Sequence, residues 1–201
     1  MIPTPAASSR VPIALIAGKR GTSSISADLE GLLGAAGRRV GIVRRGLRVD
    51  RCSVAAIADS APPTDTEAFR RGIDVVLKGT CGFVVIDAGN EAAVAATRPV
   101  DRARLVLCAP RENEAVRQHA ALGGPIVVRA AREGREHIEL RSAGKVLAST
   151  PVSSIPGARG RLPRRARARM FAVALAFGLG LSSQQIASAA ERQTRFCVAT
   201  T

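Results

Sequence analysis

The sequence predicts an α/β fold: a mostly parallel, P-loop-like sheet flanked by helices, with a small antiparallel β insertion and a helical C-terminus. The apolar run at residues 11–17 leads into a glycine-rich turn and then a helical segment, the pattern of a buried strand followed by a helix. Further apolar runs alternate with helical segments up to Gly124. After Pro125 the runs are short and separated by turn residues, as in an antiparallel meander.

The parallel core is predicted over residues 11–124. Leucines share one face of its first helix, and Gly37 ends that helix. Thr64 and Glu67 form a capping box for the second helix. The predicted strands cover residues 11–17, 39–43, 54–58, 82–87 and 103–109, and the predicted helices cover residues 24–36, 64–79 and 111–122.

In the rest of the chain, the short runs separated by turn residues predict a β meander over residues 125–150. Residues 151–163 are rich in Pro, Gly, Ser and Arg and are predicted to form a linker. Two helices then close the chain, and Ser182 with Gln185 caps the second one. We expect a disordered N-terminus, one α/β domain and a short tail. Their ranges are 1–10, 11–195 and 196–201, with the closing helices over 164–193.

The composition is strongly basic and poor in aromatic residues. The net charge is +14, the pI is about 11.5, and only 2% of residues are aromatic. A basic balance favours polyanion partners, such as nucleic acid, phosphorylated ligands or an acidic protein. The lack of aromatic residues argues against modules that stack bases on aromatic platforms. Arg residues spread over every segment more often reflect a residue bias than a binding surface.

Cysteine usage and hydropathy indicate a cytoplasmic protein. The cysteines at 52, 81, 108 and 197 are widely spaced and form no C-x-x-C pair, so we expect buried free thiols and no zinc site. Residues 1–10 lack the apolar stretch of a signal peptide. The most apolar segment, residues 170–181, is shorter than the roughly 20 residues that a membrane span needs. We therefore expect no membrane association.

The turn after the first strand resembles a phosphate-binding loop. A P-loop reads G-x-x-x-x-G-K-[ST], where backbone N–H groups and a Lys surround the phosphates and a hydroxyl binds Mg²⁺. Thr22 stands where that Lys belongs. The predicted phosphate-binding residues are Gly18, Lys19, Gly21, Thr22, Ser23 and Ser24. The alternative interpretation is a helix N-terminus with a tight glycine turn and serine caps.

Two further sets of residues are candidates for function. Asp87 ends a predicted strand and, with Ser23, is a candidate Mg²⁺ ligand; the alternative is a cap on the next helix. Arg164, Arg165 and Arg167 belong to a basic run that leads into a helix and is a candidate site for an anion or a partner protein. The alternative for this run is a solvated helix start.

Several segments in order resemble the Mur ligase family, especially the central ATPase domain of cyanophycin synthetase. Residues 18–24 (GKRGTSS) are similar to the family's G-T-N-G-K-T-[ST] loop, and residues 36–41 (AGRRVG) to its A-G-[KR]-x-V-G. Residues 85–89 (VIDAG) resemble the strand that ends in a Mg²⁺-binding acid, and residues 100–107 (VDRARLVL) resemble the next strand. Residues 171–181 (FAVALAFGLGL) look like the helix after the adenine-contacting motif.

The sequence departs from this family at the positions that serve ATP and the acceptor substrate. The two Asn of the nucleotide-contacting motif fall on Arg165 and Ala168, and a D-H pair is missing around residues 110–112. The chain also ends where the family's C-terminal amino-acid-binding domain would begin. The resemblance thus implies a truncated, degenerate relative, which acts as an accessory or partner-binding subunit, for instance beside a full-length ligase.

Two other functions stay open at this point. In one, the chain is an active ATP- and Mg²⁺-dependent amide ligase in which Lys19 replaces the missing lysine. In the other, it is a basic protein that associates with nucleic acid or another polyanion and uses the fold as a scaffold. ATP and Mg²⁺ are thus the cofactors to test, with no bound cofactor as the alternative. No residue pattern identifies a catalytic acid, base or nucleophile.

Overall fold

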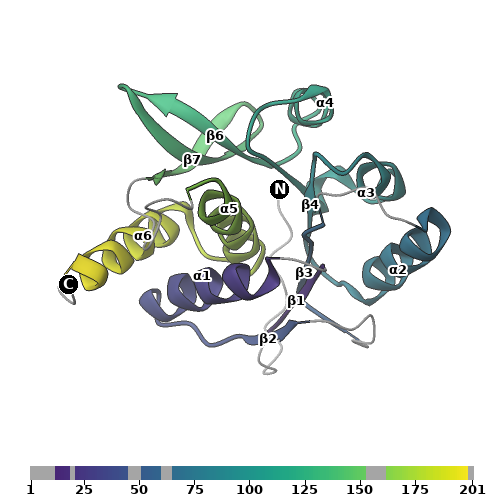
Figure 1. Cartoon of the computed structure of the whole chain (residues 1–201), viewed down its shortest axis with the longest axis horizontal. Coiled ribbons are helices and arrows are strands. Elements are labelled where there is room, and N and C mark those ends of the chain that lie inside the picture. Colours follow the sequence, from purple (N-terminus) through teal and green to yellow (C-terminus); the bar gives the residue numbers. More distant parts are fainter. Residues whose placement is uncertain (1–11, 19–20, 45–50, 60–64, 153–161, 199–201) are drawn as a thin grey trace.

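The computed structural model describes residues 12–18, 21–44, 51–59, 65–152 and 162–198. They form an eight-stranded sheet in the order β2-β1-β3-β4-β5-β6-β7-β8, with helices on both faces (Figure 1). The strands are β1 Ile13–Ala17, β2 Gly41–Arg44, β3 Val54–Ile57, β4 Val84–Asp87, β5 Leu105–Ala109, β6 Ile126–Arg132, β7 Arg135–Ser142 and β8 Lys145–Pro151. The helices are α1 Thr22–Ala35, α2 Thr66–Gly79, α3 Glu91–Ala96, the 3-10 turn η1 Arg102–Arg104, α4 Glu114–Ala121, α5 Leu162–Gly178 and α6 Ser183–Val198.

The predicted α/β class is confirmed. Strands β1 to β6 pair in parallel, and β6, β7 and β8 pair antiparallel. The predicted meander is not set apart from the core, because β6 joins it to the parallel sheet through its pairing with β5. The turns of the meander place Glu133 and Ala143 at a φ of 49°, each followed by a glycine at positive φ, as tight hairpin turns require.

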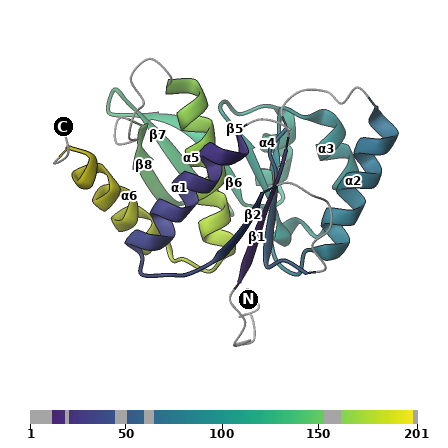
Figure 2. The same ribbon diagram turned by 60° about the horizontal axis from the view of Figure 1, so that its bottom comes forward.

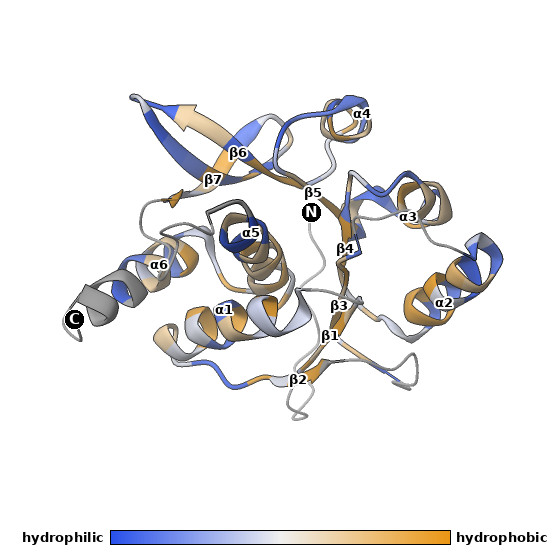
Figure 3. Ribbon diagram, viewed as in Figure 1, coloured by the Kyte–Doolittle hydropathy of each residue, from blue (hydrophilic) through white to orange (hydrophobic). Residues whose placement is uncertain are grey.

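The short strands are buried on both faces, so their side chains alternate between two apolar clusters. Ala14 and Ile16 contribute to the cluster beneath α1, α5 and α6, whereas Leu15 faces the cluster beneath α2, α3 and α4. This two-sided burial explains why the parallel strands read as continuous apolar runs. Figure 2 shows the two helical layers on either side of the sheet, and Figure 3 shows apolar residues concentrated on the central strands.

Helix α5 is the most deeply buried helix segment of the first cluster. All residues from 170 to 176 are buried. The helix packs against α1 and lies over strands β3 to β7, so it covers the middle of one face of the sheet (Figure 1). The predicted closing helices are thus confirmed, although α6 extends to Val198 rather than ending near residue 193.

The helix caps correct parts of the sequence-based prediction. Asp65, not Thr64, caps α2, because its carboxylate accepts a hydrogen bond from the amide of Ala68; Thr64 itself lies outside the described residues. Helix α4 begins at Glu114, after the cap Asn113, rather than at residue 111. The reciprocal cap of α6 by Ser182 and Gln185 is confirmed, with hydrogen bonds of 2.9 and 3.2 Å.

The cysteines agree with the prediction only in part. Cys52 and Cys108 are buried free thiols, but Cys81 is free and exposed. It lies in the turn between α2 and β4, so the expectation of a buried thiol is wrong for this cysteine. The described residues contain no group of three or more His, Cys, Asp or Glu side chains that could hold a metal. The expected absence of a zinc site remains a prediction.

Candidate functional site at the carboxyl ends of the strands

The turn between β1 and α1 has the glycine geometry that the sequence predicted. Gly18 has a φ of 154° and Gly21 a φ of 80°, both in the region that favours glycine. Helix α1 begins directly afterwards at Thr22, and Gly21 caps it without a side-chain hydrogen bond from any described residue. The predicted serine caps are therefore wrong. Ser23 is exposed and Ser24 is half-buried, while Lys19 lies outside the described residues.

Asp87 lies at the carboxyl end of β4 and is only 4% exposed. Its Oδ1 accepts a hydrogen bond of 2.8 Å from the amide of Gly89. Its Oδ2 accepts two from the guanidinium of Arg167, at 2.9 Å from Nε and 2.5 Å from Nη2. Asp87 does not cap α3, since Asn90 does so. The interpretation of Asp87 as a helix cap is thus wrong, and its main partner is a cation from α5.

Arg167 connects several elements at this edge of the sheet. Its Nη2 also donates to the carbonyl of Ala58, just after β3, and its guanidinium lies 5.1 Å from the centre of the Phe171 ring. A Cβ added to Gly21 would lie 3.9 Å from Arg167 Nη1. We call the set of Asp87, Arg167 and the Ala58 carbonyl the Asp87 clasp. The Arg167 guanidinium lies beside the turn where the P-loop Lys is missing, but its charge is already paired with Asp87.

The arginines at the start of α5 lie on different sides of the helix and therefore differ in burial and in partners. Arg164 is exposed, whereas Arg167 turns to the sheet and Arg169 is buried beside Asp28 of α1, with Nη2 4.0 Å from Oδ1. Burial raises the pKa of Asp28, while the charges of Arg169 and Arg165 oppose this. Residues 165 and 169 are four apart and share one face of a helix. Of the three candidates, Arg164 is exposed, Arg165 is half-buried and Arg167 is paired with Asp87, so they do not form one surface.

Mg²⁺ does not fit the clasp as its residues stand. A Mg²⁺ ion needs oxygen ligands in near-octahedral geometry, but both oxygens of Asp87 are already hydrogen-bonded, Oδ1 to the Gly89 amide and Oδ2 to the Arg167 guanidinium. No interaction between Ser23 and Asp87 is found among the described residues. Without the metal and the P-loop Lys, the ATP triphosphate would lack two of the charges that neutralise it.

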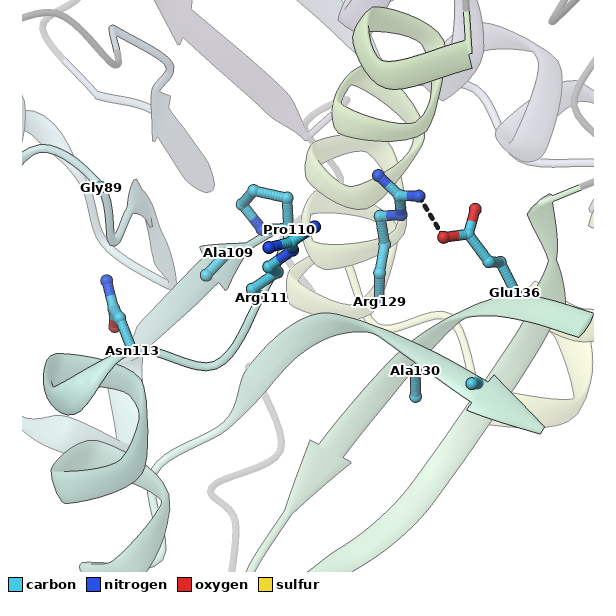
Figure 4. Close-up of a pocket in the computed structure, with 9 residues that line it drawn as sticks. Gly89, Ala109, Pro110, Arg111, Asn113, Arg129, Ala130 and Glu136 are labelled. Atoms are coloured by element: carbon cyan, nitrogen blue, oxygen red, sulfur yellow. Dashed lines mark hydrogen bonds and ion pairs between the residues drawn. The ribbon is translucent and has the colours of Figure 1, made fainter.

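A pocket of about 430 Å³ opens at the same edge of the sheet, where β5 ends and β6 enters the hairpin (Figure 4). Its charged lining residues are Arg111, Arg129 and Glu136, and Gly89 lies at its border with the Asp87 clasp. The sequence analysis missed this pocket, because β6 and β7 bring Arg129 and Glu136 together only through the hairpin register. The one available signal was the general rule that ligands bind at the carboxyl ends of parallel strands.

Taken together, these features define a mostly parallel α/β domain with a glycine turn and a charged site at the carboxyl edge of the sheet. The computed structure is similar to the crystal structure of UDP-N-acetylmuramate:L-alanyl-γ-D-glutamyl-meso-diaminopimelate ligase from Neisseria meningitides. The TM-score is 0.60 at 11% identity, over 90% of this chain and 65% of the ligase chain. The chain therefore has the fold of a Mur ligase and spans less than two thirds of that enzyme.

Sequence comparisons add no closer relationship. No protein-family profile matches the chain, and no curated protein matches it. The structural similarity supports the Mur ligase fold but does not test the finer resemblance to cyanophycin synthetase. Among the described residues, no helix is both long enough and apolar enough to cross a lipid bilayer.

Proposed function

We propose that this chain is a Mur-ligase-like domain that has lost ATP-dependent ligation and acts as an accessory or partner-binding subunit. One observation carries this proposal. The acid expected to bind Mg²⁺, Asp87, is held by the guanidinium of Arg167 at 2.9 and 2.5 Å. An internal cation thereby pairs with the carboxylate that the resemblance assigns to the metal. The Thr at position 22, in place of the P-loop Lys, supports the same conclusion.

The energetics of the clasp favour a permanent contact over a transient one. Arg167 Nε and Nη2 both reach Asp87, and Nη2 also reaches the Ala58 carbonyl. The Asp87 side chain is 5% exposed and the Arg167 side chain 25% exposed, so solvent screens their attraction only weakly. Exchanging Arg167 for Mg²⁺ would leave the guanidinium without its buried acceptors, at a cost of several kcal/mol.

The experiment is calorimetric titration of the purified chain with ATP and ADP, each with and without Mg²⁺. We expect no Mg²⁺-dependent nucleotide binding to the unaltered chain or to the control variant Arg164→Met, which removes an exposed charge from the same helix. Micromolar binding that requires Mg²⁺, or ATP-dependent amide formation by the chain alone, would contradict the proposal and favour an active ligase with a non-standard P-loop.

The accessory role makes a separate prediction about partners. A complete Mur-type ligase from the same cell is the first partner to test, because a domain with the same fold can occupy the place of one of its own domains. Sedimentation of the two purified proteins, alone and mixed, should reveal a complex that forms without ATP. Independent sedimentation at every concentration tested would argue against this partner and move the search to other protein subunits.

A further inference from the structure

The pocket between the end of β5 and the β6–β7 hairpin has a charge that its own residues do not balance. Arg129 Nη2 lies 2.5 Å from Glu136 Oε1, so these two residues neutralise each other. Arg111 lines the same pocket, is exposed, and makes no ion pair with any described residue. The lining therefore carries one net positive charge beside a half-open pocket (Figure 4).

The guanidinium of Arg129 is also short of acceptors. Its Nε is buried and has no hydrogen-bond partner in the described part of the chain, although guanidinium groups that are mostly buried usually satisfy their donors. The side chain is 21% exposed, and Figure 4 shows it beside Glu136, across the pocket from Arg111 and Pro110. An additional acceptor in the pocket would relieve this deficit through a small shift of the Arg129 side chain.

The remaining walls are small and apolar. Ala109 and Pro110 form one side, and Ala130 and Ala131 form the other. The volume of about 430 Å³ lies within the range of small-molecule sites. An apolar lining with one unbalanced guanidinium suits a monoanion with an apolar body, since Arg binds carboxylates through paired N–H groups. A phosphate carries more charge than this lining compensates and has no apolar part to bury.

We propose that this pocket binds a small carboxylate with an apolar body, whose carboxylate group pairs with Arg111 and approaches Arg129. The inference goes beyond the proposed function: neither arginine takes part in the Asp87 clasp, and the site requires neither nucleotide nor metal. Asn113 contributes by holding the loop in place, because its side-chain amide donates to the Ala88 carbonyl and its oxygen caps α4.

The test uses 3-phenylpropanoate as the probe and its neutral amide, 3-phenylpropanamide, as the matched control. Binding to the full ¹⁵N-labelled chain is followed by amide chemical-shift changes. We expect saturable shifts for residues around 109–113 and 129–136 with the acid, and a dissociation constant about tenfold weaker for the amide, as expected for a charge-assisted contact. Arg111→Ala should weaken acid binding by a similar factor, whereas Arg98→Ala, an exposed arginine outside this lining, should not.

Four outcomes would overturn the proposal. The acid could produce no saturable shifts in this region, or the amide could bind as tightly as the acid. Alternatively, Arg98→Ala could weaken binding as much as Arg111→Ala, which would show general attraction to a basic protein. Inorganic phosphate is titrated in parallel, and phosphate binding as tight as that of the acid would contradict the assignment of a carboxylate with an apolar body. Because the readout is independent of ATP, failure here leaves the proposed function standing.

Discussion

Asp87 and Arg167 are 80 residues apart in the sequence, and each was a candidate site residue for a different reason. Asp87 could be predicted because it ends an apolar strand, where acids often serve ligands. The role of Arg167 could not be predicted in the same way. It belongs to a run of arginines, and which member faces the sheet depends on how α5 rotates when it packs on α1 and β3.

The clasp leads to a prediction at the scale of single residues. Arg167→Met should lower the free energy of unfolding by about 3 kcal/mol, because it leaves the Asp87 carboxylate buried without its cation. Asp87→Asn should be destabilising as well. The double variant should lose less than the sum of the two by at least about 1 kcal/mol, as expected for residues in contact. Urea unfolding of the four proteins measures this, and strictly additive losses would show that the contact contributes nothing.

At the scale of elements, the sequence predicted the long helices and buried strands better than their ends. Continuous apolar runs identified β1, β4 and β5, and paired polar residues identified the cap of α6. Helix α3 was missed because its six residues, Glu91–Ala96, are too few to show a helical period. Asp65 was missed as the cap of α2 because Thr64 precedes it and also satisfies the capping pattern.

The end of α4 offers a prediction about packing. A Cβ on Gly124 would lie 2.2 Å from His119 Nε2, whose ring is fixed by a 2.9 Å hydrogen bond to the Leu105 carbonyl. Gly124→Ala should therefore destabilise the protein by about 2 kcal/mol or more, through overpacking. Gly34→Ala is the matched control.

Gly34 lies inside α1, with nothing within 4 Å of an added Cβ. Replacing it by Ala should stabilise the protein by about 0.5–1 kcal/mol, because Ala is the better helix former. Thermal unfolding of both variants gives the comparison. Equal effects of the two substitutions would contradict the tight packing of Gly124 against His119.

At the scale of the whole molecule, the order of elements predicted the α/β class, since strands that alternate with helices produce a parallel sheet. The meander was predicted as a small antiparallel insertion within the domain, and the structure shows in addition that β6 pairs with β5 and so continues the main sheet. The sequence pattern cannot reveal this, because turn residues mark where strands end and not which strand they pair with. The 430 Å³ pocket escaped prediction for the same reason: its charged residues meet only after β6, β7 and the loop following β5 are assembled.

The net charge of +14 leads to a prediction about the molecule as a whole. Charges of one sign repel more strongly in the folded state, where they are closer together. Raising NaCl from about 20 mM to about 300 mM should therefore raise the thermal midpoint, because added salt shortens the Debye length and screens this repulsion. An unchanged or lower midpoint would indicate that local ion pairs, such as that of Arg141 with Glu112, outweigh the general repulsion.

Helix α5 closes the apolar cluster beneath α1 although it comes near the end of the described chain. During synthesis, α1 and one face of the sheet therefore lack their packing partner until α5 has left the ribosome. The contacts of Arg167 with Ala58 and Asp87, over sequence separations of 109 and 80, are completed only then. Non-local contacts of this kind slow folding. The nascent chain thus keeps the apolar face of α1 and of the sheet uncovered until α5 has been synthesised.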